Sequence, residues 1–242
     1  MASVSLRWSR QLVPALLALA ACGDSDNDVT PDAPILVDAT PGCDPATVLP
    51  SNYRPIALAS TGQVTVTTTG DITTGTLDAT AGGLAGAADQ PYLYVDLRTG
   101  AKVALTDLEA RSSAAWDVAL KRSSLRVNGG DSGTGARTLA VAFAATLAEV
   151  TSGPATGYVA DDFATDACAL VTLPGGEPAS AFGEWYGYDV DTHAVTPKPE
   201  VYVVERGDGS RTAFRVVTYY GDPASAMRGA YYQVEWKQLP AR

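Results

Sequence analysis

Short runs of alternating apolar and polar residues, separated by glycine and aspartate, constrain the fold of this chain more than any other feature. Alternation places successive side chains on opposite faces of a β-strand, and glycine and aspartate suit the turns between strands. In residues 230–237, Tyr232, Val234 and Trp236 share one face. Similar runs occupy residues 63–69, 72–77, 92–97, 102–105, 201–205 and 211–220. The sequence therefore predicts an all-β domain of antiparallel strands with very little helix.

Three segments depart from this pattern. Thr106 and Glu109 have the spacing of a capping box, which predicts a short helical turn between them. Residues 138–147 are apolar at successive positions, which is compatible with a strand buried on both faces or with a helix. Residues 151–183 are long, irregular and rich in glycine, proline and aspartate. Such segments are often functional in compact domains, so we expect a rim or lid there.

The N-terminus predicts export. Residues 1–21 hold two arginines, a short apolar run and no acid, which is typical of a signal peptide and too short to span a bilayer. The run ends Leu19-Ala20-Ala21-Cys22, which resembles a bacterial lipobox and predicts that Cys22 is acylated; the alternative is an ordinary signal peptide that ends near a cysteine. No later stretch has the length of a spanning helix, so we expect membrane attachment only through the lipid.

Residues 22–50 predict an acidic tether, and residues 51–242 predict the folded domain. The tether is rich in aspartate and proline and has few large apolar residues, so it cannot offset its ordering entropy. Cys43 and Cys168 remain once Cys22 is acylated, and an exported chain most economically pairs them in a disulfide. The alternative, thiolates that bind a metal or a haem iron, lacks a second cysteine or histidine at ligand spacing.

Charge and residue counts exclude several classes of function. Removal of residues 1–21 takes away two of the 17 basic residues and none of the 27 acidic ones, which leaves a net charge of -12 and argues against binding nucleic acid. The only histidine is His193, which excludes a zinc site built from histidines. No nucleophile and base pair is visible, so we do not expect an enzyme, although a two-carboxylate glycosidase remains open. Residues 129–135 are rich in glycine but lack the Gly-Lys of a phosphate-binding loop, so we expect a flexible connection between strands there. Arg206-Gly207-Asp208 spells a tripeptide that some adhesion receptors recognise, but it suits a hairpin turn, which we expect instead.

One region resembles a known family. Residues 116–122, WDVALKR, followed by residues 125–133, LRVNGGDSG, resemble the signature of the HmuY family of haem-binding bacterial surface lipoproteins. The order of the aromatic strand 92–97, the segment 184–188 and the strand 201–204 resembles that family too. The resemblance covers about residues 92–239 and implies an all-β fold of two lobes with long connecting loops that grip one haem edge-on.

The signature itself is better explained as scaffold than as a binding site. Trp116, Val118 and Leu120 alternate to one face, as in a core strand. The polar and charged residues of the signature could pair with one another or hold the Asn-Gly-Gly loop that follows; these are Asp117, Lys121, Arg122 and Arg126.

Haem binding requires apolar walls and one or two axial ligands from histidine, methionine, cysteine or tyrosine. The family's haem-binding prototypes use two histidines or two methionines, whereas the mature chain has only His193 and Met227. One ligand position of the family falls near Tyr188, and Tyr186 lies close to it in the sequence. The other ligand position of the family is not located in residues 151–183. Alternatively, Tyr188 packs in an aromatic cluster, His193 is an exposed loop residue and Met227 fills a gap.

The resemblance therefore implies a lipoprotein of the outer membrane or cell surface that binds haem or a related porphyrin for uptake or transfer. An outer-membrane receptor is the partner that such a role implies. The alternative is a surface interaction or scaffold module that keeps the fold and binds no haem.

Overall fold

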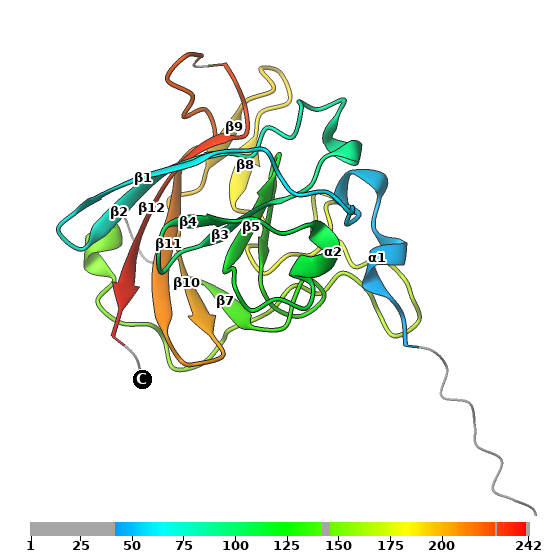
Figure 1. Cartoon of the computed structure of the whole chain (residues 1–242), viewed down its shortest axis with the longest axis horizontal. Coiled ribbons are helices and arrows are strands. Elements are labelled where there is room, and N and C mark those ends of the chain that lie inside the picture. The colour runs from blue at the N-terminus through cyan, green and yellow to red at the C-terminus, as the bar shows by residue number, and fades with distance from the viewer. Residues whose placement is uncertain (1–41, 142–145, 226, 241–242) are drawn as a thin grey trace, which may run out of the picture. The chain divides into compact units, whose positions relative to one another are not determined.

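The computed structural model describes residues 42–141, 146–225 and 227–240 (Figure 1). Their structure is mostly antiparallel β-sheet, which confirms the predicted fold class. The α-helices α1 (Pro45–Val48) and α2 (Asp107–Ala110) are one turn long, and single 3-10 turns lie at Ser51–Tyr53, Ala87–Asp89 and Leu147–Glu149. The predicted capping box begins α2, because the Thr106 hydroxyl accepts from the Glu109 amide and the Glu109 side chain accepts from the Thr106 amide.

The larger sheet has six strands in the order β1-β2-β12-β11-β10-β7. Every neighbouring pair in it is antiparallel, and a bulge interrupts the β11–β12 register between Val216 and Thr218. The predicted strands confirmed here are β1 (Val64–Thr69), β2 (Ile72–Asp78), β10 (Val201–Arg206), β11 (Arg211–Thr218) and β12 (Tyr231–Leu239). The ambiguous apolar run begins as strand β7 (Ala136–Val141), and its residues 142–145 lie outside the described residues.

The smaller sheet has four strands in the order β4-β3-β5-β6. Its strands are β3 (Leu93–Asp96), β4 (Ala101–Val103), β5 (Val118–Lys121) and β6 (Ser124–Val127). A separate hairpin joins β8 (Tyr186–Tyr188) to β9 (Val195–Pro197). The family signature therefore forms the β5–β6 hairpin.

The main core takes side chains from both sheets. The predicted apolar face of β12, Tyr232, Val234 and Trp236, is at most 2% exposed and belongs to this core. It meets residues of the smaller sheet, of β10 and β11, and of the loop before β8; among them are Leu93, Val95, Val118, Leu120, Val127, Phe182, Trp185, Tyr202 and Phe214. Burial of these apolar faces supplies the main driving force for folding.

The prediction that Trp116 shares a face with Val118 and Leu120 is wrong. Val118 and Leu120 lie in the main core, whereas Trp116 lies in a second cluster with Tyr94 and Ala119. The reason is that β5 begins only at Val118, so the strand alternation does not extend back to Trp116. The indole Nε1 donates to the Ala110 carbonyl at 2.9 Å, which ties α2 to this sheet.

The N-terminal part of the described chain lies against this second cluster. The predicted signal peptide, Cys22 and residues 22–41 of the expected tether lie outside the described residues. Residues 42–50, which we also expected in the tether, contain α1 and Leu49, which is 2% exposed. The Arg126 guanidinium donates to the Tyr53 carbonyl at 2.7 Å. Among the described residues, no helix is long and apolar enough to cross a membrane.

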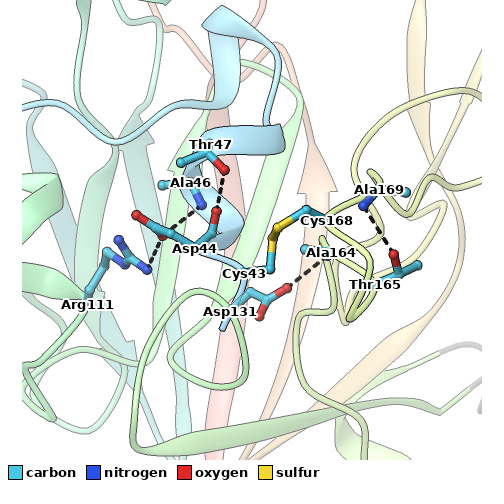
Figure 2. Close-up of a disulfide and its surroundings, with 10 residues drawn as sticks. All are labelled: Cys43, Asp44, Ala46, Thr47, Arg111, Asp131, Ala164, Thr165, Cys168 and Ala169. Atoms are coloured by element: carbon cyan, nitrogen blue, oxygen red, sulfur yellow. Dashed lines mark hydrogen bonds and ion pairs between the residues drawn. A yellow bond between two sulfur atoms is a disulfide. The ribbon is translucent and has the colours of Figure 1, made fainter. Parts of the chain in front are cut away.

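The expected disulfide joins Cys43 to Cys168, with 5.3 Å between the Cα atoms (Figure 2). The carboxylate of Asp44 accepts from the α1 amide of Ala46 at 3.1 Å and pairs with Arg111 at 2.8 Å. The start of the folded domain is therefore attached to two segments that are distant in the sequence.

Candidate ligand-binding site

A cavity of about 440 Å³ opens beside the β8–β9 hairpin. Its volume lies within the range of small-molecule sites, and its walls mix apolar, aromatic and charged groups as such sites do. The lining residues come from the loop before β8, from β8 and from the residue after β9; they are Leu173, Gly175, Glu177, Glu184, Tyr186, Gly187, Tyr188 and Lys198.

The hairpin brings Tyr188 and His193 together. The Tyr188 hydroxyl lies 2.6 Å from His193 Nδ1, and the Tyr188 side chain is 53% exposed. The Asp189 carboxylate accepts from the amides of Asp191 and Thr192, both at 2.9 Å, which closes the turn between the strands. The hydrogen bond from the Thr192 amide is the main reason that the pKa of Asp189 lies below its usual range. His193 is exposed, as the alternative interpretation expected. It also contacts Tyr188, which is a candidate ligand of the haem iron.

Tyr186 has a different environment. Its hydroxyl donates to Glu177 Oε1 at 2.7 Å, and its ring lies edge-on to Trp185 with 4.8 Å between the centroids. Burial, together with the bond to Glu177, raises the pKa of Tyr186 well above its usual range. Tyr186 therefore stays protonated and is suited to form a wall of the cavity rather than to ligate iron.

Met227 is not among the residues that line this cavity. It lies in the connection between β11 and β12, and its side chain is 87% exposed. The structure thus brings three of the four candidate residues to one hairpin and leaves Met227 on a separate loop. Sequence reasoning missed Glu177, Glu184 and Lys198, and the proline on each side of Lys198 was the one local signal for the last of these.

One wall of the cavity is formed by Leu173, Gly175 and Glu177, which belong to residues 161–181. We call residues 161–181 the wall ribbon. The ribbon turns back on itself twice, and its middle segment pairs with both neighbours, because Val171 donates to the Phe163 carbonyl and accepts from the Ala179 amide. Cys168 lies in the first turn, and the second turn lines the cavity. The expected rim at residues 151–183 therefore includes a wall of the cavity.

Asp161 attaches the ribbon to the smaller sheet. Its carboxylate oxygens accept from the amides of Ala181 at 2.7 Å and of Val127 at 3.2 Å. Burial is the largest effect on this group and raises its pKa to about 7, although the amide hydrogen bonds and the Arg126 charge act in the opposite direction.

This raised pKa predicts a pH dependence of stability. Between the ordinary value of 3.8 and about 7, the folded protein holds a proton on Asp161 that the unfolded chain has released. The free energy of unfolding should therefore fall as pH rises through this window, by at most about 1.4 kcal/mol per pH unit from this group. Urea unfolding at several pH values measures it. Asp161→Asn should lose that contribution, and an identical pH slope in the variant would contradict the prediction.

A second hollow, of about 530 Å³, lies between the glycine-rich loop after β6 and the β10–β11 turn. Two glycines of this loop are explained by packing, since a Cβ at Gly130 would lie 2.1 Å from the Asp161 carbonyl and one at Gly133 would lie 2.0 Å from Asn128 Oδ1. Asn128 holds the loop by donating to the carbonyls of Ser113 and Trp116, both at 2.8 Å. The loop connects β6 to β7, as predicted.

Fold and cavity together define an antiparallel β domain with an open cavity of ligand-binding size beside one hairpin. The family model for the HmuY protein matches residues 88–236, more than half of the chain. The chain therefore belongs to the HmuY family, as the signature resemblance predicted.

Three solved structures similar to this chain come from three bacterial species. An apo HmuY analogue from Tannerella forsythia is 17% identical, with a TM-score of 0.48, over 74% of this chain and 97% of that one. A candidate HmuY-like heme-binding protein from Bacteroides vulgatus is 18% identical, with a TM-score of 0.48 and the same coverage of each chain. A candidate lipoprotein from Bacteroides fragilis is 20% identical, with a TM-score of 0.46, over 72% of this chain and 92% of that one. No curated protein matches.

Proposed function

We propose that this protein is a surface lipoprotein that binds haem or a related porphyrin for uptake or transfer, and that it is not an enzyme. Membership of the HmuY family supports haem as the cargo. The observation that carries the proposal for this chain is that Tyr188, which lines a cavity of ligand-binding size, is hydrogen-bonded to His193.

The pair has the chemistry of an iron ligand. A tyrosine ligates haem iron as the phenolate, so its proton must be drawn away from the oxygen. His193 Nδ1, at 2.6 Å, can accept the hydrogen bond from Tyr188 and so increase the negative charge on the phenolic oxygen. The ring of Tyr186 and the side chain of Leu173 offer apolar surface to the macrocycle. In this role Tyr188 would hold the iron and His193 would be its positioning residue.

The place of action follows from the N-terminal sequence. We propose that Cys22 carries the lipid and that the acidic segment after it holds the domain at the outer membrane or cell surface, where a receptor takes up the haem. The similar structure from Bacteroides fragilis is itself described as a candidate lipoprotein.

A second candidate function is an interaction module that binds another protein. Val190 and Met227 favour it, since these large apolar side chains are 72% and 87% exposed on two loops. Protein binding through these loops and haem binding at the cavity give different results in the titration below.

Hemin titration followed by Soret absorbance tests the proposed function. The wild-type protein should show a saturating shift at one equivalent. Tyr188→Phe, which removes the proposed ligand oxygen, should weaken binding by at least about 100-fold, and His193→Ala, which removes only the partner of that ligand, by about tenfold. Met227→Ala is the matched control and should bind as wild type does. A hemin spectrum that the wild-type protein leaves unchanged would overturn haem binding and favour the interaction module.

A further inference from the structure

Lys198 is the only positively charged residue among those that line the cavity. Two carboxylates, Glu177 and Glu184, line the same cavity. An anionic ligand would therefore meet an unfavourable field unless one of its negative groups reached Lys198.

The backbone holds Lys198 in a defined position. Prolines 197 and 199 flank it and fix φ on both sides. Its amide donates to the Trp185 carbonyl at 2.9 Å, which continues the pairing of the hairpin by one residue beyond the contact of Pro197 with Tyr186. The lysine side chain thus starts at the open end of the hairpin, whereas Tyr188 and His193 lie at the turn.

The two carboxylates that line the cavity leave the Lys198 ammonium available to a ligand. Glu177 is engaged, since it accepts from Tyr186 at 2.7 Å and from Ser123 at 3.2 Å. Glu184 Oε2 lies 3.9 Å from Lys198 Nζ, which is an ion pair beyond hydrogen-bond distance, and both side chains are about two-fifths exposed. A ligand carboxylate at normal hydrogen-bond distance would interact with Lys198 more strongly than Glu184 does.

The spacing along the hairpin fits a porphyrin. Three residue steps separate Tyr188 from Trp185, the residue paired with Lys198, and at about 3.3 Å per residue this is roughly 10 Å. That length is comparable with the distance from the iron of haem to the carboxylate of a propionate arm. Tyr186 lies between the two ends and faces the same cavity.

We propose that Lys198 binds a carboxylate of the ligand and so selects porphyrins with free propionate groups over their esters, with or without iron. This inference rests on the proposed function and assigns the two ends of the site. Tyr188 binds the metal, and Lys198 selects the acidic edge of the macrocycle.

The test compares hemin, hemin dimethyl ester and iron-free protoporphyrin IX by absorbance and by quenching of tryptophan fluorescence. The wild-type protein should bind hemin about tenfold more tightly than its ester, as expected for one charge-assisted hydrogen bond. Lys198→Met should weaken hemin and protoporphyrin by about tenfold and leave the ester unchanged. Lys198→Arg should restore the preference for the free acid.

Lys102→Met is the matched control, because the Lys102 ammonium donates to the Ser60 carbonyl and does not line the cavity. It should not change any of the three affinities. Equal affinity of the wild-type protein for hemin and ester, or an equal loss of both in Lys198→Met, would overturn this inference and leave haem binding in place. Failure of the wild-type protein to bind any of the three ligands would overturn both proposals.

Discussion

Replacement of both Cys43 and Cys168 by serine should lower the free energy of unfolding by about 4 to 5 kcal/mol. The disulfide joins residues 125 positions apart, and in the chain-entropy model a crosslink of that span removes about this much conformational freedom from the unfolded chain. Denaturant unfolding followed by tryptophan fluorescence measures the change. Since domains of this size are stabilised by roughly 5 to 15 kcal/mol, the loss should move the unfolding midpoint far below that of the wild-type protein.

The same variant should also bind ligand less tightly. Cys168 lies in the first turn of the wall ribbon, and the second turn of that ribbon lines the cavity, so release of Cys168 frees one end of a cavity wall. Hemin titration of the double serine variant at a temperature where it is folded should show a weaker complex than the wild-type protein forms.

The control lies beside the disulfide. Arg111→Met removes the ion pair with Asp44, whose side chains are 38% and 51% exposed, and should cost less than about 1 kcal/mol (Figure 2). Equal unfolding midpoints for the double serine variant and the wild-type protein would show that the disulfide contributes nothing to stability.

Local patterns were sufficient to predict most of the strands. β12 follows from its alternation alone, because its apolar face meets a core that buries Tyr232 and Trp236. The helical turn α2 follows from the capping residues Thr106 and Glu109, and the disulfide follows from a count of cysteines. Each of these needs only neighbouring residues or a simple pairing rule.

The features that depend on long-range contacts could not be predicted from the sequence. Nothing in the sequence around Trp116 shows that the strand begins two residues later, and nothing around Leu49 shows that it packs on the domain. The candidate site also has one part that local sequence predicts and one part that it does not. Tyr188 and His193 meet because one short hairpin carries both, whereas Glu177 reaches Tyr186 through an irregular ribbon whose path has no periodicity in the sequence.

The charged residues of the signature illustrate this limit. We expected Asp117 to pair nearby or to hold the following loop, but its partner is Arg206, 89 positions later, at the end of β10. Arg206 also lies 2.6 Å from Asp96 Oδ1, and Asp117 accepts from the Leu97 amide at 2.7 Å. One arginine of the larger sheet therefore bridges two carboxylates of the smaller one. Because that side chain is only 12% exposed, the Arg-Gly-Asp sequence at this turn does not present its arginine to a receptor.

Arg206→Met should therefore destabilise the protein by about 3 to 5 kcal/mol, because it leaves two buried carboxylates close together without a cation. Denaturant unfolding at neutral pH measures this loss. Arg98→Met is the matched control, since Arg98 pairs with Asp96 at 3.6 Å but is 58% exposed, and its removal should cost less than about 1 kcal/mol.

The pH dependence of the Arg206→Met variant separates lost charge pairing from lost packing. Burial already raises the pKa of Asp117 in the wild-type protein, and without Arg206 that pKa should rise further. A carboxyl whose pKa is higher in the folded state than in the unfolded state favours folding at low pH and loses that contribution as pH rises through the folded value. The deficit of Arg206→Met relative to wild type should therefore shrink as pH is lowered toward 4, and Asp117→Asn in the same chain should recover part of it at neutral pH. A deficit that stays constant from pH 4 to pH 8 would assign the role of Arg206 to packing rather than to charge pairing.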